Sequence, residues 1–114
     1  PRIDVVRSDD RRAHFRNDSQ CRVRTLSPLD LEKDVEFYEV AIRPAGRMTS
    51  SPHFRRTREF VTVERGSLQV TSGDETIRLE KGDSAHYPAD LPHELHNPGK
   101  SETVAFLVVI YPSD

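Results

Sequence analysis

The chain has 114 residues, of which 32% are charged and 34% are hydrophobic, and its formal net charge is -2. A chain of this length makes one domain that is large enough to fold without a metal ion or a disulfide. The balance of 17 basic and 19 acidic residues argues against a domain that grips nucleic acid by itself, since phosphate binding usually needs a basic surplus.

The expected compartment follows from the same sequence. Cys21 is the single cysteine, so it has no partner for an internal disulfide. The longest apolar run, residues 104–111, is far shorter than a membrane span, and no secretion signal opens the chain. We therefore expect a cytoplasmic protein. Because the chain begins at Pro1 instead of Met, we also expect that residues upstream have been removed.

Residues 1–35 are rich in charge and irregular, which is typical of a linker that leads into a domain. Two short pieces within them, residues 3–6 and 21–26, have the composition of edge strands. The first unit predicted is therefore a linker with N-terminal edge strands over residues 1–35.

From residue 36 to residue 114 the pattern is that of an all-β domain. Short apolar or alternating stretches are separated by turns rich in Gly and Pro every eight to twelve residues. The strands are predicted at residues 37–42, 59–64, 67–70, 76–79, 84–87, 92–97 and 103–111. The last is long and mostly apolar and is expected to be buried on both faces or nearly so. The pattern predicts a sandwich or barrel.

The candidate chemistry lies in His, Glu and Arg side chains. His53 and Arg55 have the same parity, so on a strand both side chains would point to one face. Glu59 shares that parity unless a turn at residues 56–57 intervenes. His93 follows a stiff Pro-containing loop at the start of a predicted strand. Two imidazoles and a carboxylate would suit a divalent transition metal. The alternative is that these His side chains sit at strand ends and bond to the backbone.

Two spaced motifs run through this region. In the first, six residues separate Gly46 from His53, three residues separate Arg55 from Glu59, and six more precede Gly66. In the second, Gly82 is followed after five residues by Pro88, then by His93 and Asn97.

Together the two motifs resemble the signature motifs of the cupin superfamily and cover about half of the chain. The resemblance implies a cupin double-stranded β-helix, a jelly-roll barrel. Three departures stand out: the spacer after Gly46 is one residue longer, Asp90 replaces a Gly, and Arg55 stands where the family has a second metal-binding His. Metal-binding cupins use three His and one Glu, whereas this chain keeps His53, Glu59 and His93.

Two alternatives follow for Arg55. If the guanidinium enters the barrel, it pairs with Glu59 and repels a metal, and the ligand site then binds no cofactor. If it swings outward, His53, Glu59 and His93 form the metal site of a non-haem iron type. In either case the resemblance implies a ligand site made by His53, Arg55, Glu59, His93 and Tyr87. By alternation, His86 and His96 are expected to point away from it.

The stretch from Phe37 to Gly99 also resembles the C-terminal sensor half of bacterial regulators with an Xre-type helix-turn-helix domain. Examples are Phe37–Val40, Thr57–Val63 and Tyr87–Asp90. The resemblance implies a homodimer that binds a small-molecule effector in the barrel, is not itself an enzyme, and reaches DNA only through a helix-turn-helix domain absent from this chain. The alternatives are a small stand-alone metalloenzyme, of dioxygenase or isomerase type, and an inert cupin that only forms a dimer.

Overall fold

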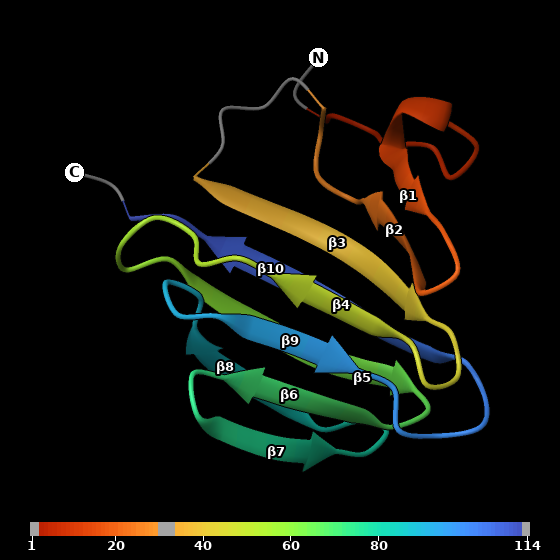
Figure 1. The fold of residues 1–114 in the computed structure, drawn as a ribbon. Coiled ribbons are helices and arrows are strands. Elements are labelled where there is room, and N and C mark those ends of the chain that lie inside the picture. The colour runs from red at the N-terminus through yellow and green to blue at the C-terminus, as the bar shows by residue number, and fades with distance from the viewer. Residues whose placement is uncertain (1–2, 30–33, 113–114) are drawn as a thin grey trace.

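The structure is a computed structural model that describes residues 3–29 and 34–112. In this part of the chain ten strands form two antiparallel sheets, and a short 3-10 helix, η1 at Arg11–Ala13, precedes the first of them (Figure 1). The prediction of an all-β domain is confirmed. No helix among the described residues is long and apolar enough to cross a membrane.

The larger sheet has six strands. In spatial order these are β1 (His14–Asn17), β2 (Cys21–Thr25), β3 (Val35–Ile42), β10 (Thr103–Ile110), β5 (Arg58–Arg65) and β8 (Ser84–Pro88). β1 and β2 come from the N-terminal segment and lie at one edge of this sheet. Residues 3–6, in contrast, form no strand, so that prediction is wrong for the first of the two short pieces.

The smaller sheet has four strands. In spatial order these are β4 (Arg47–Ser50), β9 (His93–His96), β6 (Leu68–Ser72) and β7 (Glu75–Leu79). It lies across the larger sheet, so that the two enclose a flattened barrel (Figure 1). The core between them is apolar and contains Cys21, Val23, Val40, Ile42, Val61, Val63, Leu68, Val70, Leu79, Tyr87, Leu95, Ala105, Leu107 and Val109.

Strand β10 shows how alternation distributes side chains between the core and the surface. Ala105, Leu107 and Val109 are buried, whereas the residues between them are only half-buried. The prediction of burial on both faces, or nearly so, therefore holds in full for the inner face, whereas the outer face is only partly covered. A run with no polar residue gives no parity, and only the packing of the facing sheet decides which side turns inward.

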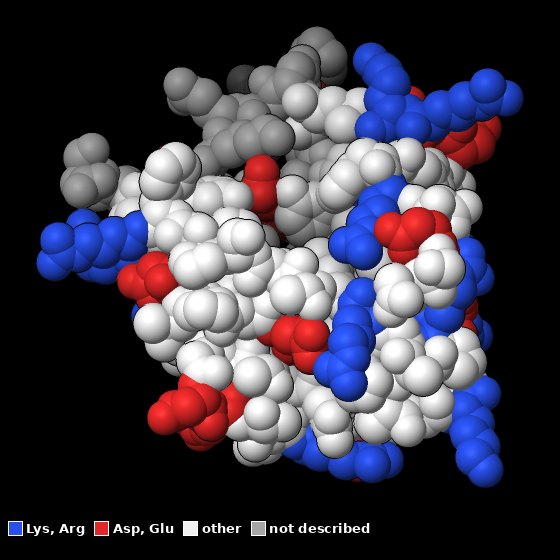
Figure 2. Space-filling model, viewed as in Figure 1, with Lys and Arg blue, Asp and Glu red and all other residues white. Residues whose placement is uncertain are grey.

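Charges of both signs are mixed over the surface. Figure 2 shows basic and acidic side chains close together on one face of the molecule. Cross-strand pairs account for part of this pattern, among them Arg24 with Glu39 at 2.9 Å and Arg47 with Glu94 at 2.6 Å. Such a surface agrees with the balanced composition of the chain.

Four segments meet at one end of the barrel, which we call the site end. They are the loop 51–57 between β4 and β5, the turn 73–74 between β6 and β7, the loop 89–92 between β8 and β9, and residues 111–112 after β10. Backbone hydrogen bonds tie these loops together: the Gly73 amide donates to the Pro92 carbonyl at 2.9 Å, and the Ala89 amide donates to the Thr57 carbonyl at 2.8 Å.

Candidate functional site

Glu59 and His93 come from opposite sheets and meet inside the site end. Glu59 is the second residue of β5, where alternation turns its side chain inward beside Val61. His93 is the first residue of β9. Both side chains are buried, with exposures of 3% for Glu59 and 4% for His93. A glutamate is rarely buried this deeply unless it has interaction partners, so groups that contact its carboxylate are expected inside the barrel.

His53 reaches the same point from a loop. Its amide donates a 2.8 Å hydrogen bond to the Ala89 carbonyl, which holds loop 51–57 against loop 89–92. The His53 side chain is 32% exposed, whereas those of Glu59 and His93 are buried. His53 therefore lies on the solvent side of the cluster.

The three side chains converge on one carboxylate oxygen. Glu59 Oε2 lies 3.2 Å from His53 Nε2 and 3.1 Å from His93 Nε2. The candidate ligand atoms of all three residues lie within 4.8 Å of one another. The structure thus brings together the three residues for which the sequence predicts a metal site.

A backbone contact fixes the tautomer of His93. Its Nδ1 lies 2.8 Å from the Leu91 carbonyl oxygen, and a carbonyl oxygen only accepts, so Nδ1 carries a proton. In the neutral ring, Nε2 then presents a lone pair toward Glu59. A lone pair facing a carboxylate is favourable only when a proton or a cation lies between the two atoms.

Tyr87 occupies the other oxygen of the carboxylate. Its hydroxyl donates a 2.7 Å hydrogen bond to Glu59 Oε1, and its ring is buried on β8. Burial, and then the charge of Glu59, raise the pKa of Tyr87 well above its usual value, so the hydroxyl keeps its proton. The carboxylate therefore has one oxygen held by Tyr87 and one directed at the two imidazoles.

The charge states in the absence of a metal follow from these contacts. Burial raises the pKa of Glu59, but hydrogen bonds from His93 and Tyr87 and the nearby histidine charges lower it by more, so it lies below its usual value. Burial lowers the pKa of His93, but the hydrogen bond with Glu59 and the contact with Leu91 raise it by more. When His93 is protonated, the proton on Nε2 takes the place that a cation would fill.

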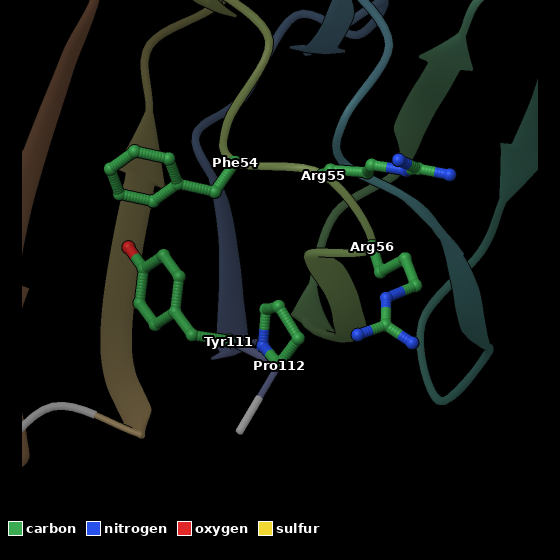
Figure 3. A pocket seen from close by; sticks show the side chains of 5 residues that line it. All are labelled: Phe54, Arg55, Arg56, Tyr111 and Pro112. Atoms are coloured by element: carbon green, nitrogen blue, oxygen red, sulfur yellow. The ribbon is translucent and has the colours of Figure 1, made fainter. Parts of the chain in front are cut away.

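Arg55 does not join the cluster. The chain turns at residues 54–57, where the Thr57 amide donates to the Phe54 carbonyl at 3.0 Å and Arg56 adopts a positive φ of 65°. This turn breaks the strand parity on which the sequence argument relied, so the prediction that positions 53 and 55 share a face is wrong. Arg55 is exposed and extends away from Tyr111 (Figure 3), and no hydrogen bond or ion pair joins it to Glu59.

The two remaining histidines near the motifs lie outside the cluster, as alternation predicts. His86 stacks on Phe60 with ring centroids 4.6 Å apart on the outer face of the six-stranded sheet. His96 is tied through Nδ1 to the Gly46 carbonyl at 3.0 Å. Neither shares the site with Glu59.

These side chains fit a divalent transition metal. Two imidazole nitrogens and one carboxylate oxygen are the donor set of many such sites, and they leave coordination positions open. The bond from His93 to the Leu91 carbonyl is the kind of outer contact that orients a metal-binding imidazole. Because Arg55 points outward, its charge does not oppose a cation in the cluster.

Sequence reasoning missed Tyr111. Its ring meets the His53 ring edge-on with centroids 6.3 Å apart, and its hydroxyl donates a 2.8 Å hydrogen bond to Glu36 Oε1. The ring therefore forms one wall beside His53. No motif marks this residue, because its approach depends on the end of β10 lying next to loop 51–57.

Comparison with known proteins agrees with this fold. Residues 39–110 match the Cupin_2 cupin domain family. A curated relative, the xanthan biosynthesis protein XanB of Xanthomonas campestris, is 28% identical over 72 residues. That match covers 63% of this chain but only 15% of XanB, so this chain corresponds to a small part of its curated relative.

Solved structures of regulators share the fold. The cupin domain of an XRE family transcriptional regulator from Enterobacter cloacae has a TM-score of 0.77 at 22% identity, over 83% of this chain and 100% of that chain. An HTH_3 family transcriptional regulator from Vibrio cholerae has a TM-score of 0.75 at 23% identity, over 82% of this chain and 52% of that chain. With the two motifs, the two-sheet barrel and the family match over more than half of its length, the chain belongs to the Cupin_2 family of cupin domains.

Proposed function

We propose that this chain is the small-molecule-sensing domain of a bacterial helix-turn-helix transcriptional regulator, with its effector bound at the site end. The carrying observation is the buried Glu59 carboxylate held between His53 and His93, in a fold that regulator domains share. An apolar core of this size does not need a buried carboxylate for stability, and burying one carries a desolvation cost. Perturbed groups in such a position mark candidate functional sites.

His53, Glu59 and His93 would hold one divalent transition metal if the domain binds one. A metal ion there would act as a Lewis acid toward an oxygen or nitrogen atom of the effector. The chain's own residues do the rest: Tyr87 holds the carboxylate in place, and the Leu91 carbonyl orients His93. His53, as the most exposed of the three side chains, meets the effector first.

The proposal gives the domain a partner and a compartment. We propose a homodimer in the bacterial cytoplasm that reaches DNA through separate helix-turn-helix domains. An apolar row on the outer face of the six-stranded sheet supports a second copy there: Val35 pairs with Ile110, and Phe37 and Phe60 flank Val108. In such a dimer, an effector changes the affinity for DNA only if it binds one arrangement of the two subunits more tightly than another.

Thermal unfolding tests the binding site. Mn²⁺, Fe²⁺, Ni²⁺ and Zn²⁺ and a panel of small metabolites are screened against the chain, because a ligand that binds the native state raises its unfolding midpoint. We expect at least one ligand to stabilise the wild type and to lose its effect in His93→Ala and in Glu59→Gln. If no ligand shifts the midpoint, the domain is an inert cupin; if the shift survives both substitutions, the site is elsewhere.

A second candidate, a metalloenzyme, rests on the same donor set with open coordination positions. Elemental analysis of protein purified without chelator, followed by assays for dioxygenase and isomerase turnover, separates the two. If the protein contains stoichiometric iron, manganese or nickel and also shows turnover, its function is that of an enzyme and the proposed sensor function is wrong. Effector-dependent release of operator DNA, measured on the longer protein that the proposal requires, would support the sensor.

A further inference from the structure

A hollow lies beside the cluster at the site end. Its volume is about 620 Å³, within the usual size of small-molecule sites, and it is lined by Phe54, Arg55, Arg56, Tyr111 and Pro112. In Figure 3, the rings of Phe54 and Tyr111 lie on one side and the two arginine side chains on the other. Among the residues that the structure describes, the lining thus combines an aromatic wall with two cations and includes no carboxylate.

The charge of Arg55 is not matched within the described protein in the way that several other arginine charges are. Arg24 and Arg47 each pair with a glutamate on a neighbouring strand. Arg22 pairs with Glu102, the residue just before β10. Arg55, in contrast, is exposed and makes no hydrogen bond or ion pair with any residue that the structure describes. A permanently charged guanidinium beside a cavity of this size is suited to bind a carboxylate or a phosphate. It contacts either group through two parallel N–H groups.

The loop that carries these residues is held in a defined shape. Arg56 sits at a φ of 65°, which is unfavourable for a side chain other than Gly, and its amide donates a 2.8 Å hydrogen bond to Asp90 Oδ2. Asp90 is therefore engaged with the loop backbone. Non-Gly residues held at positive φ by surrounding contacts cluster at ligand sites. The loop presents Phe54, 78% exposed, next to the cavity.

The aromatic wall connects the cavity with the cluster. Tyr111 is anchored through its hydroxyl to Glu36, and its ring lies edge-on against His53. An occupant lying along Tyr111 is therefore beside the most exposed member of the cluster. A flat apolar body would cover Phe54 and Tyr111, which the aqueous solvent now reaches.

We propose that this cavity binds an organic anion that has an acid group, a carboxylate or a phosphate, on a planar apolar body. The acid group lies on the Arg55 and Arg56 side, and the planar body lies against Phe54 and Tyr111. The assignment of this acid as the effector rests on the proposed sensor function, whereas its binding to the cavity does not. The proposal also gives a role to position 55: it recognises the acid group of the ligand, whereas the same position in the family motif carries a metal-binding His.

Calorimetric titration with simple probes tests the proposal. Benzoate and phenyl phosphate carry the two acid groups on the same ring, and benzyl alcohol is the uncharged control. In the double variant Arg55→Gln with Arg56→Gln we expect both acids to bind at least about tenfold more weakly, since charged hydrogen bonds are lost. The alcohol should change by less than about twofold. Whichever acid binds more tightly identifies the acid group.

Controls separate charge, shape and folding. Arg78→Gln, on edge strand β7 away from the cavity, removes the same type of charge and should leave both acids unaffected. Phe54→Ala should weaken benzoate more than acetate. Unfolding midpoints within experimental error of the wild type show that the exposed substitutions leave the fold intact. Equal binding of the acids and the alcohol, no binding at millimolar concentration, or equal losses in both arginine variants would overturn the proposal.

One variant distinguishes this inference from the sensor function. Acid binding that depends on Arg55 and Arg56 but is unchanged in His93→Ala supports the cavity and contradicts a shared effector site. Metal-dependent or effector-dependent DNA release with no acid binding contradicts the cavity and leaves the sensor function standing.

Discussion

The Tyr87 hydroxyl and the Glu59 carboxylate are joined by a 2.7 Å hydrogen bond inside the barrel, between neighbouring strands of one sheet. Glu59 thereby keeps Oε2 for the two imidazoles. In Tyr87→Phe, Oε1 loses this donor while it stays buried, and we expect the free energy of unfolding to fall by about 1–3 kcal/mol. Urea denaturation of metal-free protein measures this loss.

Tyr111→Phe is the matched control, because it removes a tyrosine hydrogen bond to a glutamate at a less buried site. Its loss should be smaller, below about 1 kcal/mol. Equal losses in the two variants would mean that Oε1 of Glu59 finds another donor in Tyr87→Phe.

The Glu59–His93 pair predicts how stability depends on pH in the absence of metal. The pKa of His93 is raised, so its contribution is complete below its unfolded value of 6.5 and is lost as the pH rises through the folded-state pKa. The pKa of Glu59 is lowered, so its contribution is complete above its unfolded value of 4.5 and is lost as the pH falls through the folded-state pKa. The pair therefore stabilises most between these two values.

Urea denaturation in the presence of a chelator, at about pH 5.5 and about pH 8, tests this dependence. Wild type should lose more stability over this interval than His93→Gln, in which the titrating ring is absent. With a divalent metal present the trend should reverse, because metal affinity rises as the imidazoles lose their protons. Equal pH dependence in wild type and variant would contradict the pairing.

Much of the site was predictable from the spacing of residues. Alternation along β5 and the Pro-containing turn before β9 are local features, and they correctly bring Glu59 and His93 together. The apolar strand β10 gave no such signal, and the inward set Ala105, Leu107 and Val109 emerges only from packing. The hydrophobic pattern of a strand therefore predicts which side chains point into the site only when apolar and polar residues alternate clearly along that strand.

Loop geometry was less accessible. The turn at residues 54–57 depends on Asp90, which accepts the Arg56 amide, and on Ala89, which bonds to the backbone at His53 and Thr57. These contacts join segments more than thirty residues apart in the chain. A single sequence carries no sign of them, so the outward direction of Arg55 stayed one of two alternatives.

The glycines of the two motifs give a paired test of the fold. Gly66 and Gly82 both have positive φ, at 82° and 88°. They differ in the space around them. A Cβ added at Gly66 would lie 2.7 Å from Thr103 Oγ1, whereas a Cβ added at Gly82 would meet nothing within 4 Å. Gly82→Ala should therefore cost only backbone strain, about 1–2 kcal/mol. Gly66→Ala should cost about 1–3 kcal/mol more, because it also displaces Thr103, whose hydroxyl bonds to the Ser67 carbonyl.

Thermal and urea unfolding of the two alanine variants measure the difference. Asn97, whose amide group bonds to the Ile42 and Ser101 carbonyls, lies at the same end of the barrel and provides an independent reference through Asn97→Ala. Equal losses at Gly66 and Gly82 would show that Thr103 moves aside without cost, which would contradict tight packing there.

Arg55→His tests whether position 55 can supply the ligand that metal-binding cupins have. By motif spacing alone, this substitution would complete the motif and should tighten metal binding. The structure predicts otherwise: the turn at residues 54–57 directs position 55 outward, and moving it inward would break the hydrogen bonds that hold Arg56 to Asp90 and His53 to Ala89.

We expect the affinity for Zn²⁺ or Mn²⁺ to change by less than about threefold, since no new coordination bond forms. Calorimetry beside His93→Ala, which should lose at least about tenfold, provides the scale. A tenfold gain in Arg55→His would mean that loop 51–57 rearranges around a bound ion, and the outward Arg55 would then belong only to the metal-free protein.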